Sequence, residues 1–173
     1  MASLVINSLW NCNVYLNGTS LLGRAEQFEV PQPKRLMQAY KGLGMMGRIE
    51  VPVGWDKIEA KVTWSSFDST TIGQLVSSTG MQQFSAMGDL QVLSAAGETS
   101  ELPVVYNLTG MTKDPGVVPF RAQENIAYAT MITVYHVDLT VAGSQVYLFD
   151  AFSNQFVVNG VDQLAQYRTN IGG

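Results

Sequence analysis

The stretch that decides the fold of this chain is Arg35–Trp64, RLMQAYKGLGMMGRIEVPVGWDKIEAKVTW. Apolar and polar residues alternate in Arg35–Tyr40 and again in Arg48–Val53, and a glycine-rich loop separates these two runs. A third alternating run then places four apolar side chains on one face: Ile58, Ala60, Val62 and Trp64. Alternation with a period of two is typical of β-strands. The stretch therefore predicts a β-hairpin followed by a further strand.

The loop of this hairpin combines backbone freedom with apolar side chains. Its glycines can adopt conformations that are closed to other residues, and its two methionines are flexible and apolar. An apolar loop tip usually needs a partner. We therefore predict a contact between subunits through Tyr40, Gly42, Gly44, Met45, Met46 and Gly47.

The same loop matches the dinucleotide-binding pattern G-x-G-x-x-G, and Asp68 follows at about the distance of a ribose-binding acid. That site also requires a helix that begins at the third glycine and points its N-terminus at the pyrophosphate. Pro52 and the alternation from Arg48 onward exclude this helix. An enzyme that uses this loop therefore remains only an alternative.

The composition indicates one domain whose surface is partly covered. The chain has 173 residues, enough for a single core. Charged residues make up 14% and apolar residues 46%, whereas about 25% charged residues is usual. The net charge of −4 and the lack of a Lys/Arg cluster beyond Lys34-Arg35 argue against tight nucleic-acid binding. Cys12 is the only cysteine, which excludes an intrachain disulfide and a cysteine-based zinc site.

The rest of the chain alternates strands with turn signals. Asn17-Gly18 predicts a hairpin between 13–16 and 20–30. We expect a short helix from Ser69, capped by that residue, and a last helix over Val161–Arg168, capped by Asn159. Further strands are expected at Gln82–Leu93, Glu101–Thr112, Ile126–Leu139 and Ser144–Phe149, with a turn at 96–100 and a loop at 113–125. The predicted fold is mainly β: an antiparallel sandwich or barrel with a short flanking helix and a C-terminal helix and arm.

Groups that could carry chemistry are sparse. His136 has Asp138 two residues further on, which is too few groups for a hydrolase or a metal site. The carboxylates are scattered singly rather than paired as acid and base. We therefore expect no enzyme, no cofactor and no metal. No apolar run is long enough for a membrane span, and the N-terminus is a poor signal peptide, so we expect use in a cytoplasm and no membrane insertion.

Two separated segments resemble a known family. The first is Lys34-Arg35 followed by Gln38–Gly42, Gly44-Met45, Gly47 and Val53-Gly54. The second is Val158–Leu164 followed by Arg168, Asn170, Ile171 and Gly172. Both resemble the major tail tube protein of contractile-tailed phages, and the second is also similar to the R-type pyocin tube.

This resemblance implies a subunit that forms hexameric rings, which stack helically into a tube inside a contractile sheath. The expected partners are further copies of the chain, the tail sheath protein, baseplate and tail terminator proteins, and a tape measure protein in the lumen. DNA would be only a transient, non-specific cargo. The tube would be part of a virion assembled in the host cytoplasm. The alternatives are a cytoplasmic β-sandwich binding module and the tube of a phage-tail-like bacteriocin or type VI secretion-like particle.

The resemblance also divides the single domain, residues 1–173, into parts. Residues 1–12 would be an N-terminal arm, 34–55 an extended hairpin loop, and 159–173 a C-terminal helix and arm. The C-terminal part adds contact residues to the prediction: Val161, Leu164, Tyr167 and Arg168. Because a channel for DNA should repel phosphates, the predicted lumen-facing acids are Glu50, Glu59 and Asp138.

Overall fold

The computed structural model describes residues 4–30, 32–77, 79–120, 122–124 and 126–172. The described chain is mainly antiparallel β-structure with two short helices, which confirms the predicted fold class. In order, the elements are β1 (Ile6–Leu16), β2 (Thr19–Ser20), β3 (Ala25–Glu29), β4 (Arg35–Tyr40), β5 (Ile49–Trp55), β6 (Ile58–Trp64), α1 (Ser69–Ser77), β7 (Gln82–Ser94), β8 (Gly97–Asp114), β9 (Tyr128–Val141), β10 (Ser144–Asp150), β11 (Gln155–Val158), β12 (Val161–Asp162) and α2 (Ala165–Asn170).

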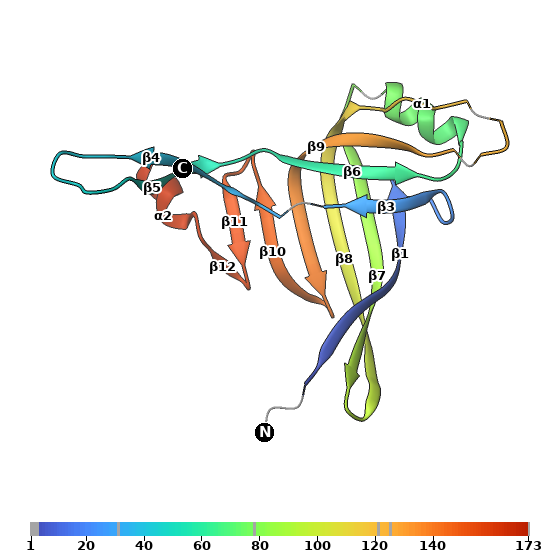
Figure 1. Ribbon diagram of the computed structural model, residues 1–173, viewed down its shortest axis with the longest axis horizontal. Coiled ribbons are helices and arrows are strands. Elements are labelled where there is room, and N and C mark those ends of the chain that lie inside the picture. Colours follow the sequence, from blue (N-terminus) through green and yellow to red (C-terminus); the bar gives the residue numbers. More distant parts are fainter. Residues whose placement is uncertain (1–3, 31, 78, 121, 125, 173) are drawn as a thin grey trace.

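A ten-stranded sheet forms the body of the molecule, and β4 and β5 form a separate two-stranded sheet. The main path of the large sheet runs β12-β11-β10-β9-β8-β7-β1-β2. Figure 1 shows this sheet curving across the view, with the β4–β5 hairpin projecting to one side of it.

Strand β9 joins this sheet to a second layer. Its first half pairs with β6, with Ile58 opposite Val134 and Trp64 opposite Tyr128, while its second half pairs with β10. Strand β3 pairs with the far edge of β6. The β3–β6 layer folds over one face of the large sheet, and Phe28 of β3 stacks on Phe84 of β7 with ring centroids 6.5 Å apart. The core lies between these layers.

The core follows from the alternation in β6. Its residues are alternately buried and half-buried, and the four apolar side chains predicted to share a face are at most 3% exposed. Trp64 donates a hydrogen bond from Nε1 to Thr130 Oγ1 at 2.8 Å, so the one polar atom of this buried ring is satisfied. Below it, one cross-strand row carries apolar residues through the large sheet: Leu16, Phe84, Leu108, Val137, Phe149 and Phe156.

A bulge in β9 reverses which side chains are buried. Thr109 of β8 lies opposite His136, but Gly110 lies opposite Val134, so Tyr135 is an extra residue. Buried positions therefore change from Ile132 and Val134 to Val137 and Leu139. The strand predicted at Ile126–Leu139 is therefore present, but one inserted residue exchanges its two faces midway.

The N-terminal region pairs differently from the prediction. Strand β1 pairs with β2 over two residues beside the Asn17-Gly18 turn, and the expected second strand 20–30 is interrupted before β3, which pairs with β6. Residues 6–12, assigned above to an arm, belong to β1 and pair with β7 from Ile6 onward. Residues 1–3 of that arm lie outside the described residues.

The predicted central helix is present as α1, but its cap is one residue earlier than expected. Asp68 Oδ2 accepts hydrogen bonds from the backbone N–H (3.0 Å) and the hydroxyl of Thr71, so Asp68 and not Ser69 caps the helix. The strands β7 and β8 form the predicted hairpin, although β8 already begins at Gly97, inside the expected turn. Neither of the described helices is long and apolar enough to cross a membrane.

Candidate assembly surfaces

The β4–β5 hairpin is fastened to the body only at its base. The Trp55 ring packs edge-on against Phe156, with centroids 4.6 Å apart, and against Phe149 at 6.2 Å. The Arg35 guanidinium lies 5.2 Å from the centre of the Trp55 ring, and Asp56 donates its backbone N–H to Lys34 O. Beyond this base, all residues of β4 are exposed.

The tip of the hairpin exposes apolar side chains, but they are not all the predicted ones. Met45 folds back, and its Sδ accepts a hydrogen bond from the Gly42 N–H at 3.1 Å. Leu43 and Met46 are fully exposed instead. Gly44 has a φ of +83°, which only glycine adopts readily, so it sets the turn that points Leu43 and Met46 outward. Tyr40 is 54% exposed beside Gly42, and Gly47 ends the loop.

The hairpin is also the most basic part of the described chain. Between residues 34 and 55 it has one acidic residue, Glu50, and four basic residues: Lys34, Arg35, Lys41 and Arg48. The whole chain, by contrast, has a net charge of −4. An isolated two-stranded hairpin is at best marginally stable in water. Its exposed apolar positions include Leu36, Met37, Ile49 and Val53. This segment therefore has the properties of a surface that another molecule covers.

The C-terminal segment is a small hairpin followed by a short helix. Asn159 and Gly160 have φ values of +48° and +78° and form the turn between β11 and β12, with Val158 opposite Val161. The predicted helix over Val161–Arg168 with an Asn159 cap is therefore wrong: α2 begins at Ala165. Asn-Gly favours a two-residue hairpin turn because both residues tolerate positive φ.

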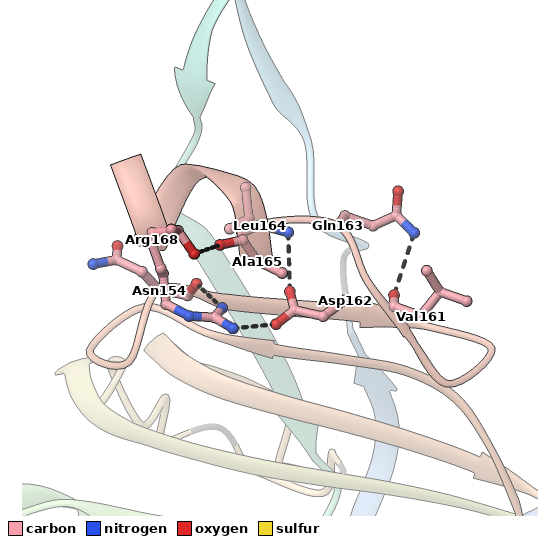
Figure 2. Close-up of polar contacts among 8 residues, drawn as sticks. Asn154, Val161, Asp162, Gln163, Leu164, Ala165 and Arg168 are labelled. Carbon is pink, nitrogen blue, oxygen red and sulfur yellow. Dashed lines mark hydrogen bonds and ion pairs between the residues drawn. The ribbon is translucent and has the colours of Figure 1, made fainter. Parts of the chain in front are cut away.

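Asp162 and Arg168 hold α2 against this hairpin (Figure 2). The Arg168 guanidinium pairs with Asp162 Oδ2 and also donates from Nη1 to Asn154 O at 2.9 Å. Asp162 Oδ1 accepts the Leu164 N–H at 2.9 Å. The hydrogen bonds from Arg168 and from the Leu164 backbone lower the pKa of Asp162 below its usual range. Arg168, predicted as a contact with a neighbour, is thus used within its own chain.

The other C-terminal residues predicted as contacts with a neighbour are at least partly exposed. Val161 is 62% and Tyr167 51% exposed, while Leu164 is half-buried. Leu164 and Tyr167 line a pocket of about 570 Å³ together with Val53, Trp55 and Phe149. The structure therefore brings the base of the β4–β5 hairpin and the C-terminal segment to one place, although the hairpin tip lies away from it.

The outer face of the large sheet, opposite the core, is polar and acidic. Cross-strand partners share a face. One outer row is Gln83, Thr109, His136 and Asp150, and the next is Ser85, Asn107, Asp138 and Leu148. Asp89 and Glu101 continue this face on β7 and β8. Within the described strands β1, β7, β8, β9, β10 and β11, the one Lys or Arg is Lys113.

Lys113 lies near the end of β8, beyond these two rows, and is paired with an acid. It donates to Glu59 Oε1 at 2.6 Å, and Lys57 donates to the same oxygen at 2.9 Å. The hydrogen bond from Lys113 has the largest effect on the pKa of Glu59 and the one from Lys57 the next largest, and both lower it. Of the three acids predicted to line a channel, Glu50 lies on the β4–β5 hairpin. Glu59 lies on β6 opposite Thr133, where the outer face continues beyond the two rows, and is paired with these two lysines. Asp138 lies within the two acidic rows and has no Lys or Arg partner there. The structure does not bring the three together.

His136 pairs with Asp150 across the β9–β10 ladder, not with Asp138. Its Nδ1 lies 3.1 Å from Asp150 Oδ2. Burial alone would raise the pKa of Asp150, but hydrogen bonds from Ser153 and His136 lower it. Among the described residues, no group of three or more His, Cys, Asp or Glu side chains could hold a metal ion. The glycine-rich loop continues into strand β5 and not into a helix, so a pyrophosphate site lacks its helix N-terminus.

Sequence reasoning predicted acids on one strand face but not which acids make up the rows of this face. The signal was available in the absence of Lys and Arg from long strands, yet the bulge at Tyr135 concealed which acids share a face. It also missed the role of Arg168, because an Asp six residues earlier suggests no contact until the turn at 163–164 places α2 beside β12.

Comparison with known proteins shows which family this chain is similar to. A family model described as phage tail tube protein FII matches residues 6–172. The tail tube protein of Escherichia phage P2 is 30% identical over 161 residues, which cover 92% of this chain and 94% of that protein.

Two solved structures are similar in fold at 10% sequence identity. One comes from the sheath-tube complex of an extracellular contractile injection system, PVC, in the extended state, with a TM-score of 0.53, covering 77% of this chain and 90% of that chain. The other comes from the sheath/tube terminator of the same kind of system, with a TM-score of 0.55, covering 77% of this chain and 95% of that chain.

Proposed function

The chain belongs to the phage tail tube protein FII family and is a tail component, and from this premise we propose that it forms hexameric rings that stack helically into the inner tube of a contractile tail. The observation that carries the proposal is the long antiparallel sheet, which has an apolar inner face and an acidic outer face. Closed by rotation, one such sheet per subunit makes a barrel.

The acidic outer face would line the lumen of this tube. DNA carries one negative charge per roughly 1.7 Å of helix axis, and each Lys or Arg on the wall would exchange counterions for a phosphate contact. A wall with Asp89, Glu101, Asp138 and Asp150, whose long strands contain Lys113 as their one Lys or Arg, paired with Glu59 at the end of β8, would let the cargo pass with few such contacts. Of the acids predicted from sequence, Asp138 is the one that this arrangement uses.

The other two surfaces would hold the subunits together. The β4–β5 hairpin, through Tyr40, Leu43 and Met46, and the C-terminal segment, through Val161 and Tyr167, expose apolar side chains at places away from the core. A head-to-tail contact that closes gives a ring, and a second contact along the axis gives a filament. Sheath, terminator, baseplate and tape measure proteins are the partners that a tube in a virion would meet, with assembly in the host cytoplasm.

Electron microscopy of the purified protein tests the assembly. We expect long cylinders of uniform width. Particles that remain monomeric at all concentrations and salt conditions would contradict the proposal and favour a binding module.

A charge reversal tests the lumen. Asp138→Lys combined with Asp89→Lys should leave tubes intact, because both side chains lie outside the core, and should slow genome ejection in a phage background. Added salt should partly restore the rate, because it screens the new contacts. The matched control is Glu50→Lys on the hairpin. Wherever this variant forms tubes, genome ejection should proceed at the wild-type rate. Double-mutant tubes that eject at the wild-type rate in low salt would contradict an acidic lumen.

A further inference from the structure

Asp150 is the last residue of β10 on the acidic outer face, and it organises the turn that follows it. Its Oδ1 accepts the backbone N–H groups of Phe152 and Ser153, each at 2.9 Å. Its Oδ2 lies 3.1 Å from His136 Nδ1, so β9 holds the same carboxylate from the other side. A carboxylate that binds the backbone two and three residues ahead fixes the conformation of a turn. The position of this turn therefore depends on a side chain of the outer face.

The bulge in β9 holds the beginning of the same turn. Ala151 donates its backbone N–H to the carbonyl of Tyr135, the extra residue of the bulge, at 2.9 Å. The Tyr135 and Phe152 rings also lie together, with centroids 5.1 Å apart. Bulges often re-aim a side chain or a chain segment. Here the bulge fastens the turn 151–154 to the central strand of the sheet.

The far end of this turn holds the C-terminal segment. The Asn154 carbonyl accepts a hydrogen bond from Arg168 Nη1 at 2.9 Å, and the same guanidinium pairs with Asp162 (Figure 2). Asn154 has a φ of +50°, in the left-handed region that asparagine tolerates better than most residues, so the direction of its carbonyl is a property of the turn.

Helix α2 is held mainly by these polar contacts. All six of its residues belong to the described part of the chain, and none of them is buried. An element with little buried surface opens at a low free-energy cost. The attachment of α2 is therefore sensitive to any movement of the carbonyl that Arg168 uses.

A cavity beside the turn leaves it room to move. The pocket of about 570 Å³ between the base of the β4–β5 hairpin and the C-terminal segment is also lined by Asp150, Ala151 and Asn154. A close-packed surrounding would keep the turn in place without its hydrogen bonds. Beside an open cavity, the hydrogen bonds decide where the turn lies.

We propose that Asp150 is a positioning residue for the C-terminal segment. With His136 it holds the turn 151–154, and the turn presents the Asn154 carbonyl to Arg168, which keeps α2 docked. A change at Asp150 on the acidic face is thereby transmitted to α2. This inference goes beyond the proposed function, because the coupling is a property of one subunit.

In a tube the coupling would join two of the proposed surfaces. Asp150 lies on the face proposed to line the lumen, whereas α2 belongs to the segment that exposes Val161 and Tyr167 as contacts with a neighbour. A disturbance of the wall at Asp150 would then reach the contact between subunits.

Amide exchange in dispersed subunits tests the coupling in both directions. Asp150→Ala should speed the exchange of residues 163–172 about tenfold, the factor expected when a hydrogen bond to a charged group is lost. Because coupling between two sites is reciprocal, Arg168→Gln should speed exchange at the amides of Phe152 and Ser153. The proposal is overturned if Asp150→Ala affects the turn alone or if Arg168→Gln affects α2 alone.

Asp138→Ala is the matched control. Asp138 lies on the same face, but it accepts its hydrogen bond from the Gln145 side chain, at 2.8 Å, and not from the backbone of a turn. Residues 163–172 should exchange at the wild-type rate in this variant. Equal acceleration would mean that α2 responds to the charge of the whole face, which overturns the specific role of Asp150.

The amides of β6 are the internal reference for global unfolding. If Asp150→Ala speeds their exchange as well, Asp150→Asn replaces it, because the amide oxygen can still accept from the turn while the charge is lost. We expect a smaller acceleration, confined to the turn and residues 163–172. Acceleration of residues 163–172 that never exceeds that of β6 in either variant overturns the proposal.

Tube formation tests the consequence for assembly separately. Asp150→Ala should raise the protein concentration at which tubes appear, and Asp138→Ala should leave it unchanged. Asp150→Ala tubes at the wild-type concentration would overturn the link from the outer face to the subunit contact. If the wild-type protein forms no tubes, the proposed function fails, while the exchange experiment still decides the coupling.

Discussion

Strand β6 and the β4–β5 hairpin come from one continuous stretch of sequence and end in opposite environments. Both alternate apolar and polar residues. In β6 every second residue is buried, whereas in β4 every residue is exposed. The difference lies in what each strand pairs with: β6 lies between β3 and β9, and the hairpin pairs only with itself. Alternation therefore predicts a strand, but it does not reveal whether the cover comes from the same chain or from another copy.

The largest expected effect is on the β6 side of this comparison. Trp64→Ala removes a ring that is 1% exposed, together with its hydrogen bond to Thr130. Large-to-small changes of this kind cost about 3–5 kcal/mol, a large part of the roughly 5–15 kcal/mol by which a domain is usually stable, so the free energy of unfolding should fall by about that amount. Denaturant titration measures this loss. A change below about 1 kcal/mol would mean that β6 contributes no more to the stability of the fold than the exposed hairpin does.

Trp55 lies at the junction of the two regions and should have an intermediate effect. Trp55→Ala removes its edge-on contacts with Phe149 and Phe156, worth about 0.5–1.5 kcal/mol each. We expect a moderate drop in Tm and faster amide exchange in β4 and β5 at an unchanged rate in β6. Trp55→Phe is the matched control, which should retain most of the stability. Equal acceleration in β6 would show that hairpin and body unfold as one unit.

A smaller, local effect is expected from pH at the C-terminal segment. The pKa of Asp162 in the folded chain is lowered from its ordinary 3.8, so its pair with Arg168 contributes fully above that value. The contribution is lost as the pH falls through the lowered folded pKa. Amide exchange in residues 163–172 should therefore accelerate in acid while the core strands stay protected.

Arg168→Gln provides the comparison for this titration. In the variant the same residues should exchange faster already at neutral pH, and their exchange should no longer respond to the titration of Asp162. An unchanged acid response in Arg168→Gln would show that the pair does not anchor α2.

The smallest effect on folding, and the largest on assembly, is expected at the hairpin tip. Leu43→Asp with Met46→Asp changes two fully exposed side chains, so the free energy of unfolding should stay within about 0.5 kcal/mol of wild type. Tubes should be absent in electron micrographs. Met45→Asp is informative beside it, because Met45 folds onto Gly42 and should affect the loop itself more than the contact. Normal tubes from the double variant would remove the hairpin tip from the assembly contacts.

Local signals in the sequence determined much of this fold. Alternation located β6, β7, β8 and β10, and Asn17-Gly18 marked a turn between β1 and β2. The exposed hairpin loop was predicted as well, because glycines and flexible apolar residues at a turn are readable without knowing what surrounds them. Residues along one strand are neighbours in sequence, so the patterns they form survive in the sequence alone.

Tertiary structure decided what depends on pairing between distant residues. The bulge at Tyr135 arises from the register with β8 and places Asp138 on the acidic outer face, and only the folded chain shows that Glu59 is paired with Lys57 and Lys113. Asn159-Gly160 has the same local signal as Asn17-Gly18, and only the β11–β12 ladder distinguishes a turn from a helix cap there. Periodicity sets which residues alternate along a strand, but the partner strand fixes the register and therefore the face that each side chain occupies.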